Sequence, residues 1–312
     1  MNSTPTVILT GPTATGKTDL SITLARYYNA PVISADARQC YKYLDIGTGK
    51  PSPETLTEIP HYHISTLNPD ELYNASDFAG DFKHWSNSIR KQGKPVLVAG
   101  GSTLYIESLI RPLDDLPPRN EANLLELQNI ADRDGLTSIQ KKLEEVDPAY
   151  AQRIDGPNPH RMFRALDVWM QTGRPFSSFH KNRPFSLPEN TLLICLHRER
   201  AELHQRINTR VDQMITDGLI EEVRSILGMG YEPNLQSLQT VGYREAIACI
   251  RGELTSEEMR EKIKTNTRRY ARRQLTWFRR WKQGAWLDQT GQSKKKLTKT
   301  VIKMTEQLAA ET

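Results

Sequence analysis

Residues 11–18 read GPTATGKT and fit the pattern G-x-x-x-x-G-K-[ST] completely. Glycines in such a loop let backbone amides turn toward phosphate oxygens, and the lysine adds a positive charge. The hydroxyl of Thr18 can bind Mg²⁺. The pattern predicts a diphosphate- or nucleotide-binding loop made of Gly11, Pro12, Thr13, Ala14, Thr15, Gly16, Lys17 and Thr18. It does not distinguish ATP from a diphosphate on another carrier.

Two further residues with useful chemistry follow short apolar segments. Asp36 comes after residues 32–34, where it could act as a general base or contact Mg²⁺. A turn or helix N-cap role explains an aspartate there equally well. Ser102 comes after residues 96–99 and Gly100-Gly101, at a place where an ATPase often has an acid that holds Mg²⁺. The missing acid disfavours a standard ATPase or kinase.

The elements that must position these residues alternate between strands and helices. Apolar segments at 7–9, 32–34, 96–99 and 191–196 predict buried parallel strands, and helical spacing follows residue 17 and begins again at about residue 103. Residues 117–187 have helical periodicity with Pro and Gly breaks, which predicts about four short helices. We therefore expect an α/β fold with a P-loop NTPase-like parallel sheet core (1–116 and 188–312) and an inserted all-helical domain (117–187).

The overall composition limits the class of protein. The chain has 312 residues, is 37% hydrophobic and carries a net charge of +5. It has no apolar run near the ~20 residues that span a membrane, and its start lacks a signal-peptide pattern. Three widely spaced cysteines form no zinc or disulfide pattern, and His61 and His63 have no third metal ligand nearby. We expect a cytoplasmic monomer that does not associate with membranes.

The segments SADARQCYKYLDIGTGKP (34–51) and VAGGSTLYI (98–106), together with GPTATGKT, resemble the tRNA dimethylallyltransferase family, also called tRNA isopentenyltransferases. The resemblance implies transfer of a dimethylallyl group from dimethylallyl diphosphate to N6 of the adenosine just 3′ of the anticodon. It also implies Mg²⁺ as cofactor and a tRNA anticodon stem-loop as partner. Two positions depart from the family: Ala37 replaces a serine, and Ser102 replaces a threonine but keeps the hydroxyl.

The resemblance also assigns roles to individual residues. Asp36 would accept the N6 proton, while Lys17, the loop amides and Mg²⁺ would stabilise the departing diphosphate. Ser102, Arg206 and Arg210 would complete the catalytic set. The residues expected to bind tRNA are Asp36, Ala37, Arg38, Gln39, Ser102, His160, Arg161, Arg164, Gln239, Gly242, Tyr243, Arg244, Arg272, Arg273, Gln274, Thr276, Trp277 and Arg279.

Residues 268–282, RRYARRQLTWFRRWK, carry seven Lys or Arg and no acid, which favours nucleic-acid binding. On a helical wheel Tyr270, Trp277 and Trp281 share one face, which we expect to pack in the core while the arginines contact RNA. Tyr243 and Arg244 are expected to meet RNA by stacking and charge. Lys50 is expected to face solvent.

Three alternatives remain at this level. The first is an enzyme that prenylates free adenine nucleotides, which would need neither the helical insert nor the basic segment. The second is a P-loop kinase of small metabolites, disfavoured by the missing acid after residue 99. The third is a non-catalytic RNA-binding protein, disfavoured by the intact Lys17, Thr18 and Asp36.

Overall fold

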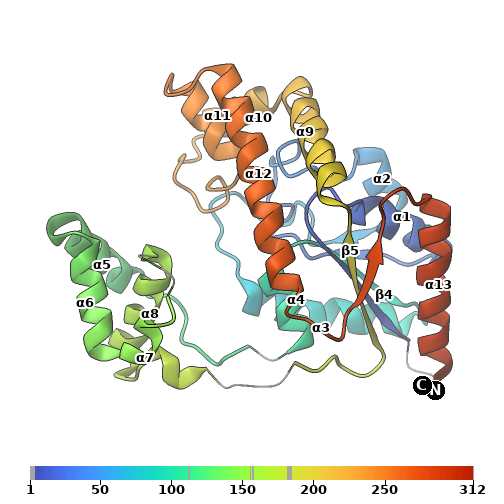
Figure 1. Cartoon of the computed structure of the whole chain (residues 1–312), viewed down its shortest axis with the longest axis horizontal. Coiled ribbons are helices and arrows are strands. Elements are labelled where there is room, and N and C mark those ends of the chain that lie inside the picture. The colour runs from blue at the N-terminus through green and yellow to red at the C-terminus, as the bar shows by residue number, and fades with distance from the viewer. Residues whose placement is uncertain (1–3, 112, 155, 157, 181–184, 312) are drawn as a thin grey trace. The chain divides into compact units, whose positions relative to one another are not determined.

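The computed structural model describes residues 4–111, 113–154, 156, 158–180 and 185–311 (Figure 1). The chain divides into two compact units, one of residues Met1–Arg111 with Phe185–Thr312 and one of residues Pro112–Pro184. The first unit holds a six-stranded sheet, and the regular elements described in the second are all helices. The predicted fold class, an α/β parallel-sheet core with an inserted helical part, is confirmed.

Every strand of the sheet runs parallel to its neighbours. The strand order is β3-β2-β4-β1-β5-β6, and β1 pairs with both β4 and β5. The strands are β1 (Thr6–Thr10), β2 (Val32–Ser34), β3 (His61–Tyr62), β4 (Val96–Ala99), β5 (Thr191–His197) and β6 (Ala285–Asp288). The apolar segments of the sequence predicted the four central strands but not β3 or β6. Both are short edge strands without the apolar run that marks a strand buried on both faces.

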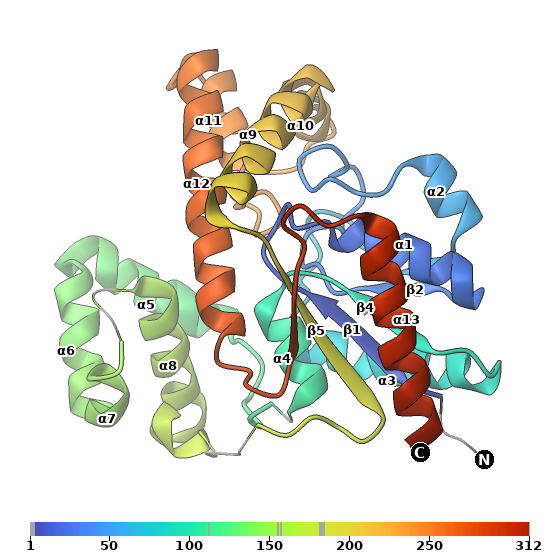
Figure 2. The same ribbon diagram turned by 45° about the vertical axis from the view of Figure 1, so that its right-hand side comes forward.

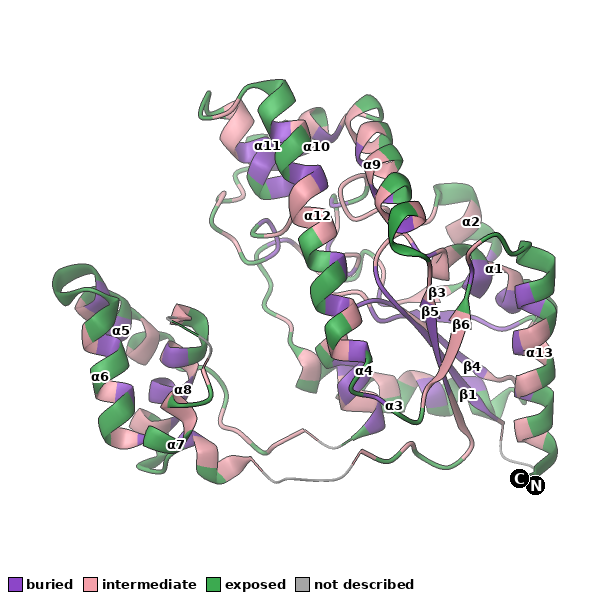
Figure 3. Cartoon of the chain, viewed as in Figure 1, coloured by how far each residue is buried: buried purple, intermediate pink, exposed green. Residues whose placement is uncertain are grey.

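Alternate residues of the central strands are buried on opposite faces of the sheet. Val7 and Leu9 pack with α1 (Lys17–Tyr28) and α13 (Lys294–Glu311), whereas Ile8 packs with α3 (Ala75–Lys91) and α4 (Thr103–Ile110). Helices therefore cover both faces, and β1 and β2 are buried along their whole length (Figure 3). This arrangement fixes the carboxyl ends of β1, β2, β4 and β5 along one edge of the sheet.

A group of helices extends from that edge. These are α9 (Arg200–Thr216), α10 (Leu219–Gly228), α11 (Tyr243–Ile250) and the long α12 (Ser256–Phe278). They share an apolar cluster with residues of the segment that follows β2, including Tyr41 and Leu44. Figure 2 shows α9 and α12 rising from the sheet, and the two helices are in contact. The short α2 (Pro53–Glu58) follows the same segment.

The second unit has its own core. It contains α5 (Glu121–Asp134), α6 (Leu136–Val146), α7 (Pro148–Ala151), α8 (Pro159–Thr172) and a 3₁₀ helix, η1 (Phe176–Phe179). Leu127, Ile139, Met162 and Leu166 are each buried within it. Across the residues that the structure describes in both units, no helix is long and apolar enough to cross a membrane.

Candidate active site

A pocket of about 1370 Å³ lies in the first unit, at the carboxyl ends of the strands. Its lining comes from the 11–18 loop, the ends of β2 and β4, the segment 45–56, α9 and α12. Lys17, Thr18, Asp36, Arg206 and Arg210, all predicted from the sequence, line it together. The structure thus gathers a phosphate loop, the Asp36 carboxylate and two arginines from distant parts of the chain.

Side chains outside the phosphate loop bind its carbonyl oxygens. Arg206 Nε donates to Ala14 O at 2.9 Å, and Arg198 Nε donates to Thr15 O at 3.2 Å. Ala14 has a φ of 63°, a left-handed conformation that costs a non-glycine residue roughly 1–2 kcal/mol. Gly16, with φ 99°, is the N-cap of α1, whose first amides lack partners within the helix. The loop is therefore held in a shape suited to an anion at the helix N-terminus.

Lys17 lies inside this loop. Its Nζ donates to Gly11 O at 2.9 Å and to Pro12 O at 2.7 Å. Burial lowers the pKa of Lys17 to about 7; Asp36 opposes this shift and Arg210 adds to it. A bound anion would raise the pKa of Lys17 in the same way as the Asp36 carboxylate does, and would favour the charged lysine.

Asp36 begins a turn directly after β2. Its Oδ1 accepts the backbone amides of Arg38 at 2.9 Å and Gln39 at 3.3 Å. Among the described residues, no hydrogen bond to Oδ2 is present, and Asp36 lines the pocket. The turn role and the base role, which the sequence left open, are therefore compatible: one oxygen shapes the turn and the other is available to a substrate.

Ser102 supports the Asp36 turn from β4. Its Oγ accepts the amide of Ala37 at 2.8 Å, and its own amide donates to Ala35 O at 3.1 Å. A side chain at Gly100 would overlap the backbone of Ala35, so the glycine permits this close approach. Ser102 occupies the N-cap position of α4 without capping it through its side chain.

Arg210 and Gln39 both bind the backbone of residues 48–49, which line the pocket. Arg210 Nη2 donates to Thr48 O at 3.1 Å, and Gln39 Nε2 donates to Gly49 O at 3.2 Å. Burial lowers the pKa of Arg210, with Asp36 opposing the shift and Arg206 adding to it. An arginine has a pKa so high that it stays charged despite this. Arg210 thus brings a permanent positive charge to the pocket, beside a lysine whose charge depends on pH.

The expected arginines lie on the exposed face of α12 and at its C-cap. Arg272, Arg273 and Arg279 are exposed, as is Thr276. Within the described part of the chain, none of these three arginines forms an ion pair. Arg273 lies over the ring of Tyr270, 5.9 Å from its centroid. Exposed arginines without acidic partners are what a phosphate backbone would contact.

Tyr243 and Gln274, both expected to contact tRNA, are buried and bonded within the protein. Tyr243 is fully buried and its hydroxyl donates to Glu222 Oε1 at 2.6 Å, so its ring cannot stack on an RNA base. Gln274 is 3% exposed, and both ends of its amide are used: Oε1 accepts Thr13 N–H and Nε2 donates to Gly101 O. We therefore correct both expectations to internal roles.

The other residues of the first unit that were expected to bind tRNA differ in their exposure to solvent. Arg244 is exposed, whereas Gly242 is buried. Gln239 is exposed and donates to Pro233 O at 2.9 Å. Trp277 is half-buried and its Nε1 donates to Glu107 Oε2 at 2.9 Å.

Two expectations about exposure were wrong. Tyr270 is 38% exposed and lines the pocket, whereas Trp277 and Trp281 pack in the core as expected. Lys50 does not face solvent: its side chain is 4% exposed and its Nζ donates to Asp45, Tyr41 O and Ser65. No local pattern marks either outcome.

Within the second unit, α8 carries His160, Arg161 and Arg164. His160 and Arg161 are exposed. Arg164 is 20% exposed, pairs with the fully buried Asp167 at 2.7 Å, and also donates to Pro117 O. Arg164 therefore helps to hold the helical unit together, while Arg161 remains accessible.

The pocket offers oxygen ligands for a metal ion but no complete metal site of its own among the described residues. Among the described residues, no group of three or more His, Cys, Asp or Glu side chains could hold a metal ion by itself. Thr18 and Asp36 both line the pocket and offer a hydroxyl and a carboxylate, the oxygen donors that Mg²⁺ prefers. A magnesium ion that also binds substrate phosphates fits these residues.

The sequence of this chain is similar to a known protein family and to named relatives. A family model described as IPP transferase matches residues 39–281. A relative named tRNA dimethylallyltransferase from Thermotoga neapolitana is 42% identical over 295 residues, 94% of this chain and 95% of the relative. A relative of the same name from Clostridioides difficile is 42% identical over 289 residues, 92% and 93% of the two chains.

Solved structures agree with the family match. The full-length tRNA isopentenylpyrophosphate transferase of Bacillus halodurans has a TM-score of 0.72 and 34% identity, with 98% of this chain and 97% of that chain covered. A eukaryotic dimethylallyltransferase acting on tRNA has a TM-score of 0.75 and 26% identity, with 92% and 74% covered. The chain belongs to the IPP transferase family.

Proposed function

We propose that this chain transfers a dimethylallyl group from dimethylallyl diphosphate to N6 of the adenosine just 3′ of the anticodon in tRNA, releasing diphosphate. One observation carries the proposal most strongly: Asp36, with Oδ2 unbonded among the described residues, lines the same pocket as the phosphate loop. The relatives' names, which describe tRNA dimethylallyltransferases, support the same reaction.

The pocket residues have separate tasks in this reaction. The N6 nitrogen attacks C1 of the prenyl group, the C1–O bond to the diphosphate breaks, and Asp36 takes the N6 proton. Lys17, Arg206 and Arg210 bind the diphosphate as its negative charge grows. Ser102 holds the Asp36 turn through Ala37, so its role is to position the base. When bound, Mg²⁺ would be held by Thr18 and would neutralise part of the diphosphate charge.

RNA binding is proposed for the exposed cations. The acceptor base must leave its stack to reach Asp36, so the surrounding anticodon loop needs to be gripped. Arg272 and Arg273 on α12 and Arg279 just after its end are suited to its phosphates because they are exposed and lack acidic partners in the described chain. Arg161 of the helical unit is proposed as a further contact, and the limits 117–187 for the inserted domain stay a prediction. The monomeric state and cytoplasmic location stay predictions.

Prenylation of a free adenine nucleotide is the alternative at the same pocket. The exposed arginines favour RNA, because a single nucleotide would not use them. The test supplies purified protein, Mg²⁺ and radiolabelled dimethylallyl diphosphate with either an unmodified tRNA or AMP. Label in the tRNA is expected. Label in AMP alone would assign the chain to the alternative, and label in neither would overturn the proposal.

A further inference from the structure

One carboxylate outside the pocket binds three consecutive backbone amides of the pocket wall. Glu222, in the first turn of α10, accepts the amides of Asp45 at 3.0 Å and Ile46 at 2.7 Å through Oε2. Its Oε1 accepts the amide of Gly47 at 3.2 Å. Successive amides that converge in this way form a concave anion site, here filled by the protein's own carboxylate.

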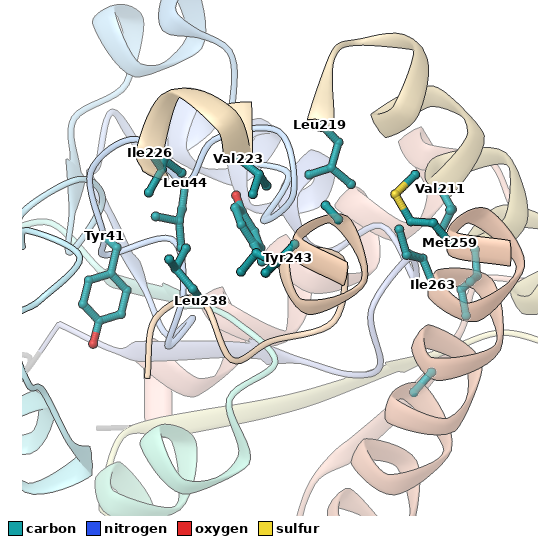
Figure 4. Packing of buried hydrophobic residues seen from close by; sticks show 14 of the residues in the cluster. Tyr41, Leu44, Val211, Leu219, Val223, Ile226, Leu238, Tyr243, Met259 and Ile263 are labelled. Carbon is teal, nitrogen blue, oxygen red and sulfur yellow. The ribbon is translucent and has the colours of Figure 1, made fainter. Parts of the chain in front are cut away.

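Tyr243 fixes the orientation of that carboxylate. Its hydroxyl donates to Glu222 Oε1 at 2.6 Å, and its ring is fully buried between α10 and the 45–47 segment. Figure 4 shows Tyr243 packed among Leu44, Val223 and Leu238. A side chain at Gly47 would overlap the Tyr243 ring, so the glycine lets the loop lie directly on it. The carboxylate therefore has four donors and little freedom to move.

The next two residues of the loop hold Arg210. Thr48 O accepts Arg210 Nη2 at 3.1 Å, and Gly49, with φ 60°, has no side chain where the guanidinium lies. The carbonyl oxygens of Thr48 and Gly49 also accept from Gln39 Nε2, at 3.4 Å and 3.2 Å respectively. Any shift of residues 45–47 would be passed directly to the Arg210 guanidinium.

We propose that Glu222, oriented by Tyr243, is a positioning residue that sets Arg210 for the diphosphate. Neither Glu222 nor Tyr243 is among the described residues that line the pocket, whereas Asp45, Thr48, Gly49 and Arg210 line it. Glu222 therefore acts through the loop and not on the substrate. The inference deepens the proposed function and rests on it for the identity of the substrate.

Inorganic pyrophosphate is the probe, because it reports the Arg210 site without requiring prenyl transfer. Glu222→Gln puts an N–H group against backbone N–H donors, so we expect pyrophosphate binding to weaken by about 10-fold, the effect of losing one well-placed charge-assisted hydrogen bond. Tyr243→Phe keeps the carboxylate and its three amides, and we expect about a 3-fold loss. Glu221→Gln, at the exposed neighbouring position, is the matched control and should change nothing.

A double-mutant cycle separates positioning from general stability. In an Arg210→Ala background, Glu222→Gln should cause little further loss of pyrophosphate affinity, because its effect passes through the missing guanidinium. A full additional loss in that background would overturn the inference. If Glu222→Gln does not fold, the same cycle with Tyr243→Phe decides the outcome.

Failure of this inference differs from failure of the proposed function. If the wild-type protein transfers label to tRNA but the Glu222→Gln and Arg210→Ala variants have additive effects on pyrophosphate affinity, only the positioning role is refuted. Coupled pyrophosphate binding without any transfer to RNA would refute the proposed reaction and leave the positioning role supported.

Discussion

Gln274 of α12 accepts a 3.0 Å hydrogen bond from the backbone amide of Thr13, so the arginine-bearing helix is bonded directly to the phosphate loop. The other end of the same amide donates to Gly101 O at 2.8 Å, in the turn after β4. The helix proposed to contact RNA and the loop proposed to hold the diphosphate are thus joined through one buried side chain.

Gln274→Ala should therefore damage the diphosphate site rather than RNA binding. Loss of the bond to Thr13 frees the loop, and we expect pyrophosphate affinity to fall by about 10-fold, the effect of one net hydrogen bond. Calorimetry measures this affinity. Thr276→Ala, two residues further on the exposed side, is the control and should leave it unchanged. A large loss of tRNA affinity with intact pyrophosphate binding would restore the direct RNA role of Gln274.

Replacing Arg272 and Arg273 together with alanine should weaken tRNA binding without changing pyrophosphate affinity. If each contacts one phosphate, the slope of log affinity against log salt should fall by about 1.4. Filter binding over a range of salt concentrations measures this. Lys295→Ala with Lys296→Ala, an exposed pair on α13, is the control. Equal effects of the two pairs would mean that net charge, not this surface, controls binding.

The lowered pKa of Lys17 predicts that the protein takes up protons when diphosphate binds. Its pKa is lowered to about 7 in the protein by burial, so at pH 8 most molecules have a neutral Lys17. A bound anion favours the charged lysine and raises that pKa, so binding at pH 8 should take up to about one proton from solution. Calorimetry of pyrophosphate binding in buffers of different ionisation enthalpy measures the uptake. In Lys17→Met the proton uptake should be smaller by up to about one proton, because the titrating group is gone. Identical uptake in the two proteins would refute the role of Lys17.

Arg161 and Arg164, one turn apart on α8, should behave differently. Arg164→Ala leaves Asp167 buried without its cationic partner, and we expect a loss of about 2–3 kcal/mol in unfolding free energy. Amide donors from Asn123 and Gln171 remain at Asp167 and limit the loss. Arg161→Ala should leave stability unchanged and weaken tRNA binding. Urea unfolding and filter binding measure the two effects, and an unstable Arg161→Ala protein would contradict this division.

The sequence was sufficient for the features that depend on local order. The phosphate loop, the Asp36 turn and the four central strands each follow from a few consecutive residues and their backbone requirements. The burial of Tyr243 and Gln274 could not be predicted, because each side chain bonds to a residue outside its own segment. These partners are Glu222 and Thr13 respectively. Polar side chains in a basic, aromatic segment look like surface residues until such a buried partner is known.

The most direct test of the proposed chemistry is the rate of prenyl transfer by Asp36→Asn. The asparagine keeps an Oδ1 that can accept the amides of Arg38 and Gln39, so the turn should persist while the base is lost. In single-turnover assays with saturating tRNA and labelled dimethylallyl diphosphate, we expect the rate to fall by about 10²–10⁴-fold. The affinity for tRNA should stay near that of the wild type. A transfer rate equal to that of the wild type would contradict the assignment of Asp36 as the base.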